Sequence, residues 1–340
     1  MTMLTNDAAR PVDSVFSLPA QKWRGEWITA GLIALLCTVI SVLNPDFLQV
    51  QTLFDLMRSI TVPGIFALGV FVVLASGGID VSFPAIAAAA LYLTATILLA
   101  VAPDAPLWVA FAVAATTGTL LGMFNGLLVD MYKVPSLIVT IGTQYLVRGA
   151  LLAFVGAVWL NDLPSHVDAF GKATITSFTS VQGVTTSMPV SALVLVVVAF
   201  VTWFILERTL MGRAIFAAGG NLLITERLGF SIRKIHLFVF GYAGLLAGIG
   251  GLVHSASTRI ANPFDLTGIE LDIIAAVVLG GARIEGGRGS VIGTILGVIL
   301  VQIIKTSLIL VGVPSTWQRI VVGLIVLVAS GVFSRQSPNR

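Results

Sequence analysis

A carboxylate and a hydroxyl stand between two apolar runs in the stretch "VVLASGGIDVSFPAIAAAA", residues 72–90. Gly77 and Gly78 come just before Asp80 and Ser82, so the polar break also holds residues that readily interrupt a helix. In one interpretation, the freed backbone and both polar side chains line a cavity and hydrogen-bond the hydroxyl groups of a solute, because broken helices inside a membrane are tolerated beside water or protein. In the other, Asp80 or Ser82 caps the helix that follows and places negative charge at the positive end of its dipole. Both interpretations are compatible with the residue types.

Further polar side chains lie inside apolar runs. Thr140, Thr143 and Gln144 have the spacing i, i+3 and i+4, which places them on one face of a helix. Asn125 lies in the preceding apolar run. These side chains either border a pathway, where weak polar contacts let a solute pass, or hydrogen-bond neighbouring helices.

The stretch "GRAIFAAGGNLLITERLGFSIRK" forms most of a long basic loop at 207–234. Asn221 can cap a short helix over 222–228, and Gly229 can end it. Such a helix, lying across the membrane face, can fill a cleft in a soluble partner and pass its motion to the spans. The alternative is a positively charged loop that only sets the topology. The candidate contact residues are Arg213, Gly220, Asn221, Glu226, Arg227, Leu228, Gly229 and Phe230.

The sequence contains no motif of the common catalytic chemistries. It has no G-x-x-x-x-G-K-[ST] loop for nucleotide phosphates, no H-E-x-x-H and no G-x-S-x-G, and its three histidines lie far apart. Its single cysteine, Cys37, excludes an internal disulfide and a cysteine metal site. We therefore expect no enzyme activity and no metal or cofactor bound by this chain. Arg148, Lys305 and Arg58 have no evident carboxylate partner in the sequence, which weakens the case for an ion-coupled carrier.

The composition is that of a membrane protein with many spans, since 57% of the 340 residues are hydrophobic and 10% are charged, against about 25% charged in soluble domains. The basic residues gather on the side that holds both termini, so the positive-inside rule places both termini in the cytoplasm. The predicted spans are 28–44, 53–75, 83–101, 107–130, 134–156, 189–206, 235–255, 268–282, 290–312 and 317–333. They define a cytoplasmic tail (1–27), a single membrane domain (28–333) with an outer loop (157–188) and the cytoplasmic loop (207–234), and a second cytoplasmic tail (334–340).

Four stretches, in the same order, resemble the permease subunits of bacterial ABC importers for ribose and related monosaccharides. They are "SGGIDVS" (76–82), "NGLLVDMYKVPSLIVTIGTQYLVRG" (125–149), "RTLMGRAIFAAGGNLLITERLGFSIRKI" (208–235) and "GIELDIIAAVVLGGARIEGGRGSVIGTILG" (268–297). One departure is "GGIDVSFP" where the family commonly has "GGIDLSVG". Phe83 and Pro84 replace a small, flexible pair and are expected to stiffen the start of the third span.

The resemblance implies an all-α transmembrane fold, a polytopic bundle of about ten spans similar to the vitamin B12 permease, in the bacterial inner membrane. It implies two permease subunits, a second copy or a sister permease, that form the translocation pathway across the lipid bilayer. Cytoplasmic ATPase chains would hold ATP and Mg²⁺ and contact the 207–234 loop, a periplasmic sugar-binding protein would deliver the solute, and no nucleic acid would take part. The pathway candidates are Gly77, Gly78, Asp80, Ser82, Asn125, Thr140, Thr143 and Gln144.

Lys172 and Arg259 are basic residues on an otherwise acidic outer face. They are candidates for contact with an acidic patch of a docked binding protein. The alternative function is a stand-alone facilitator or ion-coupled sugar carrier. The residues leave open which sugar is carried and whether the two permeases are identical.

Overall fold

The computed structural model describes residues 24–179 and 185–310, together with residues 314, 317, 320, 323 and 324. Helices account for most of this part of the chain and alternate with short connections. In chain order the elements are α2 (Arg24–Leu43), the 3₁₀ helix η1 (Pro45–Leu48), α3 (Val50–Ala75), α4 (Phe83–Val101), α5 (Leu107–Tyr132), α6 (Ser136–Phe154), α7 (Ser165–Lys172), β1 (Thr174–Thr179), β2 (Thr185–Pro189), α8 (Ser191–Arg208), α9 (Leu210–Gly220), α10 (Leu222–Arg227), α11 (Ile232–Thr258), α12 (Glu270–Leu279) and α13 (Val291–Leu310).

Eight helices in the described part of the chain are long and apolar enough to cross a membrane, namely α2, α3, α4, α5, α6, α8, α11 and α13. Each coincides with a predicted span, and several extend a few residues into polar flanks because backbone hydrogen bonding continues there. α12 corresponds to the predicted span 268–282 but is helical over only 10 residues, about 15 Å of rise, which is too short to cross a bilayer core alone. The tenth predicted span, 317–333, the tail 334–340 and most of the tail 1–27 lie outside the described residues.

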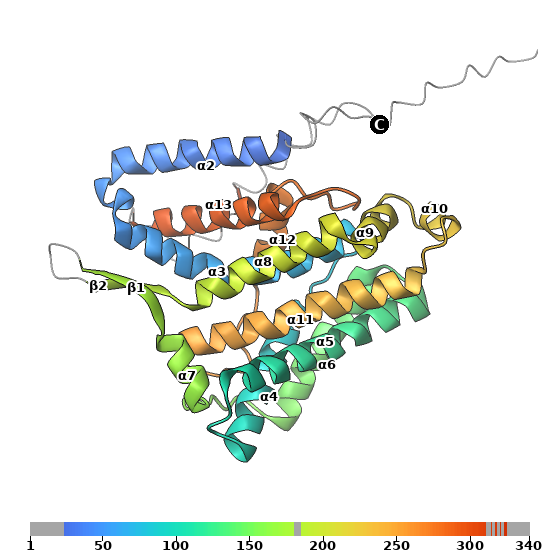
Figure 1. The fold of residues 1–340 in the computed structure, drawn as a ribbon, viewed down its shortest axis with the longest axis horizontal. Coiled ribbons are helices and arrows are strands. Elements are labelled where there is room, and N and C mark those ends of the chain that lie inside the picture. Colours follow the sequence, from blue (N-terminus) through green and yellow to red (C-terminus); the bar gives the residue numbers. More distant parts are fainter. Residues whose placement is uncertain are drawn as a thin grey trace, which may run out of the picture.

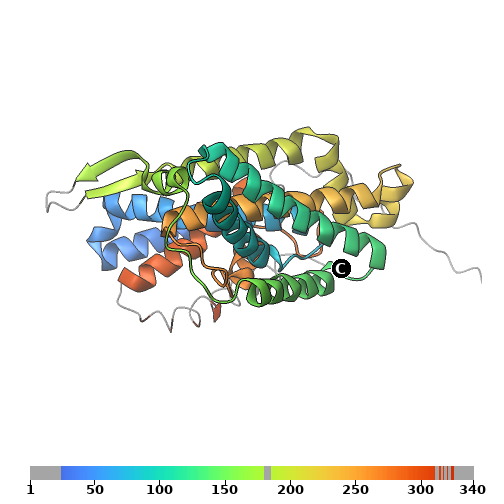
Figure 2. The ribbon, with the colours of Figure 1, turned by 90° about the horizontal axis from the view of Figure 1, so that it is seen from below.

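The bundle has two distinct ends (Figure 1). Helices α9 and α10 lie at one end, which we call the α10 end, and α7 with strands β1 and β2 lies at the other, the hairpin end. The two strands pair antiparallel, with Ser177 opposite Ser187, and project from the bundle in both views (Figures 1 and 2). Threonine-rich runs favour strands because threonine is β-branched. The all-α prediction is therefore correct for the eight described membrane-crossing helices and wrong for the outer loop 157–188, which contains this hairpin except for the last residue of β2, Pro189.

The core is built around α3, α4 and α11. Helix α3 packs against α11, α13 and α8, while α4 packs against α5, α11 and α6. Phe66, Phe71, Phe83 and Phe240 are among the large side chains buried there. By contrast, α2, α6 and α8 keep many apolar side chains exposed, as expected of surfaces that face lipid or a second subunit.

Close contact between α5 and α11 depends on glycine. A Cβ at Gly118 would overlap the carbonyl oxygen of Gly244, and a Cβ at Gly122 would overlap that of Phe240. Small residues at four-residue spacing therefore let the two helix backbones touch, which is a common way to pack helices where lipid removes the hydrophobic driving force. This glycine ladder packs two spans within one subunit.

Candidate functional site

The polar break between α3 and α4 folds into the protein interior. Gly77 turns the chain with a φ of +83°, a conformation that favours glycine. Asp80 and Ser82 are 2% and 0% exposed. Asp80 Oδ1 accepts hydrogen bonds from the backbone N–H of Ser82 at 2.7 Å and from Ser82 Oγ at 2.6 Å, and Asn125 Nδ2 on α5 donates to Ser82 Oγ at 2.7 Å. Three predicted site residues thus form one buried network that joins the break to α5.

The capping interpretation is correct for the position of Ser82 and wrong for its hydrogen bond. Ser82 occupies the N-cap position of α4, but its side chain accepts no hydrogen bond from the first turn of that helix. Asp80 accepts from the N–H of Ser82 itself, which precedes the helix. The carboxylate therefore orders the turn that leads into α4, and the effect of its charge on the helix dipole stays a prediction. Its role in solute passage stays a prediction.

Helix α6 supplies further hydrogen bonds to the break. Ser136 Oγ accepts from the backbone N–H of Ile79 at 2.8 Å, and Thr140 Oγ1 donates to the Ile79 carbonyl at 3.3 Å. The Val81 N–H donates to Thr140 Oγ1 at 3.4 Å. Thr140 and Thr143 are both buried on the helix face that their spacing predicts. Thr140 thus hydrogen-bonds the break and not a neighbouring helix, and a solute contact by this face in an assembled permease stays a prediction.

Gln144 extends the same face into a charged cluster at the other end of α6. Gln144 Nε2 donates to Oε1 of Glu270, the first residue of α12, at 2.7 Å. Arg148, one turn further along α6, donates to Thr267 Oγ1 at 2.6 Å and lies 3.4 Å from the same Glu270 oxygen. The sequence signal for Arg148 was its place four residues after Gln144, on the same helix face.

Two cations inside spans have carboxylate partners, contrary to the sequence prediction. Arg148 pairs with Glu270, and Lys305 Nζ on α13 lies 2.8 Å from Asp272 Oδ2. Both carboxylates come from the first turn of α12. These pairs join elements that are far apart in the sequence, so no local spacing reveals them. The lack of partners is therefore no longer an argument against ion coupling.

The predicted short helix forms at the α10 end. The Asn221 side chain accepts from the backbone N–H of Ile224 at 3.0 Å, as predicted for an N-cap. Leu228 is the C-cap residue, and Gly229 follows it with a φ of +88°. The helix thus ends one residue earlier than predicted, and Gly229 provides the left-handed turn one residue beyond the observed cap.

Helix α10 presents apolar side chains on the protein surface. Leu222, Leu223, Ile224 and Leu228 are 46%, 68%, 55% and 67% exposed, whereas Thr225 between them is buried. An exposed apolar patch beside charged residues is typical of a protein interface. The other predicted coupling residues Arg213, Gly220, Asn221, Glu226, Arg227 and Gly229 are exposed, and Phe230 packs partly against the core.

A cavity of ≈ 550 Å³ lies beside α10. Its lining includes Gly77 and Gly78 from the α3–α4 break, Glu226 of α10, and Asp130 and Lys133 near the α5–α6 corner. Residues predicted for two separate roles, the pathway and ATPase coupling, therefore meet at one cavity.

Backbone segments from three parts of the chain touch next to this cavity. The N–H of Gly287 donates to the carbonyl oxygen of Ala75, the last residue of α3, at 3.0 Å. A Cβ at Gly219, near the end of α9, would overlap both of these atoms, and a Cβ at Gly286 would lie 2.7 Å from Gly77 Cα. We call these five residues the glycine junction. It holds α9, which leads directly into α10, against the end of α3.

Lys172 and Arg259 both lie at the hairpin end. Lys172 pairs with Asp168 one turn earlier on α7, and its side chain is 52% exposed. Arg259 is the exposed C-cap residue of α11. Their predicted contact with a binding protein stays a prediction.

The chain is similar to curated proteins along most of its length. Residues 52–330 match a family described as "Branched-chain amino acid transport system / permease component". The ribose import permease protein RbsC of Haemophilus influenzae is 33% identical over 87% of this chain and 89% of that protein. RbsC of Bacillus subtilis is 31% identical over 87% of this chain and 88% of that protein. The autoinducer 2 import system permease protein LsrC of Escherichia coli O157:H7 is 32% identical over 88% of this chain and 84% of that protein. No solved structure gives a significant match.

Proposed function

The chain belongs to this permease-component family, and we infer that it is the membrane-spanning permease subunit of an ABC importer for a monosaccharide or sugar-like solute. Relatives named for ribose import and for autoinducer 2 import each align with most of the chain. The chain is accordingly a transport subunit with several membrane-crossing helices.

We propose that a separate cytoplasmic ATPase chain, which holds ATP and Mg²⁺, docks on α10. The observation that supports this is a short helix, capped by Asn221, whose Leu223 and Leu228 are exposed. Closure of the ATPase would displace α10, and the glycine junction would pass the displacement from Gly219 to the end of α3 and the break that follows. A lever needs a rigid connection, and direct backbone contact provides one.

The rest of the assembly follows the same proposal. The tenth span would cover 317–333, both termini would lie in the cytoplasm, and the fold would be like that of the vitamin B12 permease in the bacterial inner membrane. A second permease, identical or sister, would pack against exposed apolar helix faces, which α6 offers. A periplasmic binding protein would dock at the hairpin end, near Lys172 and Arg259, and would carry most of the selectivity for the solute.

The test compares wild type with a Leu223→Ala, Leu228→Ala double variant, purified from membranes in mild detergent with all co-purifying chains identified by mass spectrometry. Leu210→Ala is the matched control, since Leu210 is 66% exposed at the start of α9 and the two α10 leucines are 68% and 67% exposed. Burying a leucine side chain contributes about 1.5–3 kcal/mol. We therefore expect the double variant to lose the ATPase and at least about 90% of ATP-driven uptake, a tenfold effect that corresponds to about 1.4 kcal/mol.

Equal recovery of an ATPase with both variants would refute docking on α10. Uptake that persists without any ATPase would refute the importer assignment and favour the stand-alone carrier.

A further inference from the structure

A second cavity lies at the hairpin end, and none of the pathway or coupling candidates lines it. Its volume is ≈ 270 Å³, and residues of α3, α11, α12 and α13 line it, so it lies within one chain. Its polar lining includes Arg58, His254, Asp272, Gln302 and Lys305. We call it the hairpin-end cavity.

Arg58, Asp272 and Lys305 in the wall of the hairpin-end cavity each have a hydrogen-bond partner. Lys305 Nζ and Asp272 Oδ2 are 2.8 Å apart and join α13 to α12, and their side chains keep 31% and 35% exposure. Arg58 donates to the backbone carbonyl of Ser187 in β2 at 3.4 Å. Charged side chains inside spans usually face a water-filled space or the protein interior, and they often mark a site that handles a solute or ion.

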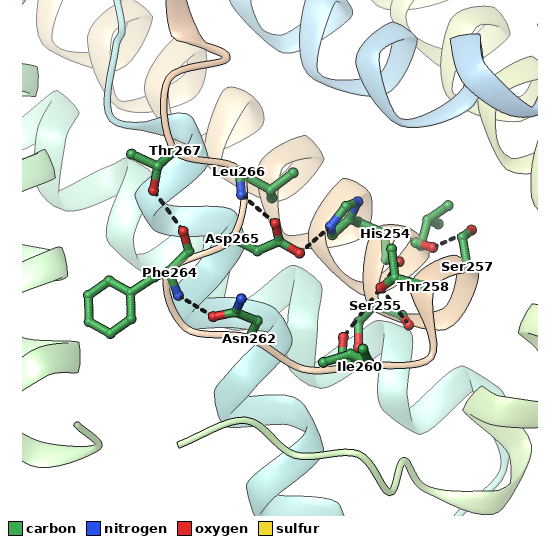
Figure 3. Close-up of polar contacts among 11 residues, drawn as sticks. His254, Ser255, Ser257, Thr258, Ile260, Asn262, Phe264, Asp265, Leu266 and Thr267 are labelled. Carbon is green, nitrogen blue, oxygen red and sulfur yellow. Dashed lines mark hydrogen bonds and ion pairs between the residues drawn. The ribbon is translucent and has the colours of Figure 1, made fainter. Parts of the chain in front are cut away.

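The loop 259–269 contributes Leu266 and Ile269 to the cavity lining, and Figure 3 shows the polar contacts that hold this loop. His254 Nε2 on α11 lies 2.7 Å from Asp265 Oδ2, and Asp265 Oδ1 accepts from the backbone N–H of Leu266 at 3.1 Å. Leu266, held at a φ of +63°, and Ile269 line the cavity. The pair of His254 and Asp265 therefore holds the loop in place beside the space.

The wall offers both kinds of hydrogen-bonding group beside an apolar surface. Arg58 and Lys305 donate, Asp272 accepts, and Gln302 does both, while Phe66 is one of the apolar residues that complete the lining. A sugar ring carries hydroxyl groups, which donate and accept, and apolar C–H faces. Asp272 already neutralises Lys305, so a ligand that both donates and accepts matches this wall better than an anion, which accepts only and could use only the Arg58 and Lys305 donors. The volume lies just below the range of about 300–1,000 Å³ that is usual for drug-sized ligands, so it suits a single small ring.

We propose that the hairpin-end cavity binds one neutral sugar of monosaccharide size, inside each permease subunit and apart from the pathway between subunits. The choice of a sugar rests on the proposed function, whereas the location rests on the cavity and its polar wall. Binding at this site takes place on the hairpin side of the membrane and does not require the ATPase.

The test measures binding of ribose, xylose and glucose to the full chain in lipid nanodiscs, without ATPase or binding protein. Saturation-transfer NMR detects the bound sugar and shows whether binding saturates. Asp272→Asn and Gln302→Leu alter the cavity wall from two different helices. Glu270→Gln is the matched control because it removes a carboxylate two residues earlier on α12, one that faces Arg148 instead. Melting temperatures verify that each variant is folded. We expect wild type and Glu270→Gln to bind one of the sugars equally, and folded cavity variants to bind it at least about tenfold more weakly.

The proposal is overturned if wild type binds none of the three sugars saturably, or if Glu270→Gln weakens binding as much as the cavity variants do. A sugar phosphate that competes more strongly than the neutral sugar overturns the ligand class. ATP-driven uptake by the assembled importer is measured in parallel. Normal uptake with no sugar bound to the isolated chain refutes this site and leaves the proposed function intact, whereas uptake without an ATPase refutes the proposed function itself.

Discussion

Replacing Gly219 by alanine tests the glycine junction directly, because the next residue provides the control. A Cβ at Gly219 would overlap the carbonyl oxygen of Ala75 and the N–H of Gly287, which hydrogen-bond each other at 3.0 Å. A Cβ at Gly220 would meet nothing within 4 Å. The two substitutions add the same methyl group at adjacent positions of α9, so their difference isolates the junction.

The expected effect follows from the atoms that must move. Overpacking between backbone segments costs about 1–3 kcal/mol, and weakening the hydrogen bond from Gly287 adds about 0.5–1.5 kcal/mol. Alanine gains about 0.5–1 kcal/mol over glycine in a helix at either position. We therefore expect Gly219→Ala to lower the free energy of unfolding by about 0.5–4 kcal/mol and Gly220→Ala to leave it unchanged or raise it slightly.

The assay has two readouts, thermal unfolding of the purified subunit and the ratio of solute imported to ATP hydrolysed by the assembled importer. If the junction transmits motion from α10, Gly219→Ala lowers that ratio at least about threefold at a temperature where the variant is folded, and Gly142→Ala on α6, where a Cβ also meets nothing within 4 Å, does not. Equal coupling ratios for the two variants would refute transmission through the junction. Equal free energies of unfolding for Gly219→Ala and Gly220→Ala would refute the packing argument as well.

Three further outcomes are expected. Arg148→Met leaves the α12 carboxylate without its cationic partner and should lower the free energy of unfolding by about 1–3 kcal/mol, so an unchanged melting temperature would contradict the pairing. Gly122→Val drives α5 away from α11 and should abolish recovery of folded protein. Gly142→Val on α6, where a Cβ meets nothing within 4 Å, should not. Equal yields of folded protein would contradict the close approach of α5 to α11. The hydrogen bond from His254 lowers the pKa of Asp265 below its usual 3.8. The ionised carboxylate therefore stabilises the fold above about pH 4, and this contribution is lost as the pH falls through the lowered pKa. Asp265→Asn should therefore be less stable than wild type at neutral pH, and its melting temperature should fall less steeply on acidification. Identical pH profiles of melting temperature for the variant and wild type would contradict a stabilising role for this carboxylate.

Helix positions were predictable because their causes are local. The span predicted at 83–101 is α4, Phe83–Val101, since an apolar run of this length in lipid must satisfy its own backbone hydrogen bonds. The cap of α10 by Asn221 is also local, because the side chain reaches a backbone N–H only three residues ahead. Short-range periodicity likewise placed Thr140 and Thr143 on one buried helix face.

The candidate site was predictable only in part. The polar break at Gly77, Asp80 and Ser82 stood out in an apolar chain. Its hydrogen-bond partners Asn125 and Thr140 lie on other helices, which the sequence did not reveal. The hydrogen bonds of α6 and the ion pairs of α12 were not predictable for the same reason, because their partners are remote in the sequence. Residue types show which groups need a partner, and they do not show which remote group is near enough to serve.

The amino-acid sequence thus sets the membrane-crossing helices, the family and the short helix α10, all of which depend on apolar runs, caps and motifs read along the chain. The packed structure sets the rest. Gly219 is required because a carbonyl oxygen from α3 lies against it, and Asp272 is paired because Lys305 of α13 comes within 2.8 Å. These relations depend on distances through space between segments remote in the chain, where a hydrogen bond or a steric overlap acts over only a few ångströms.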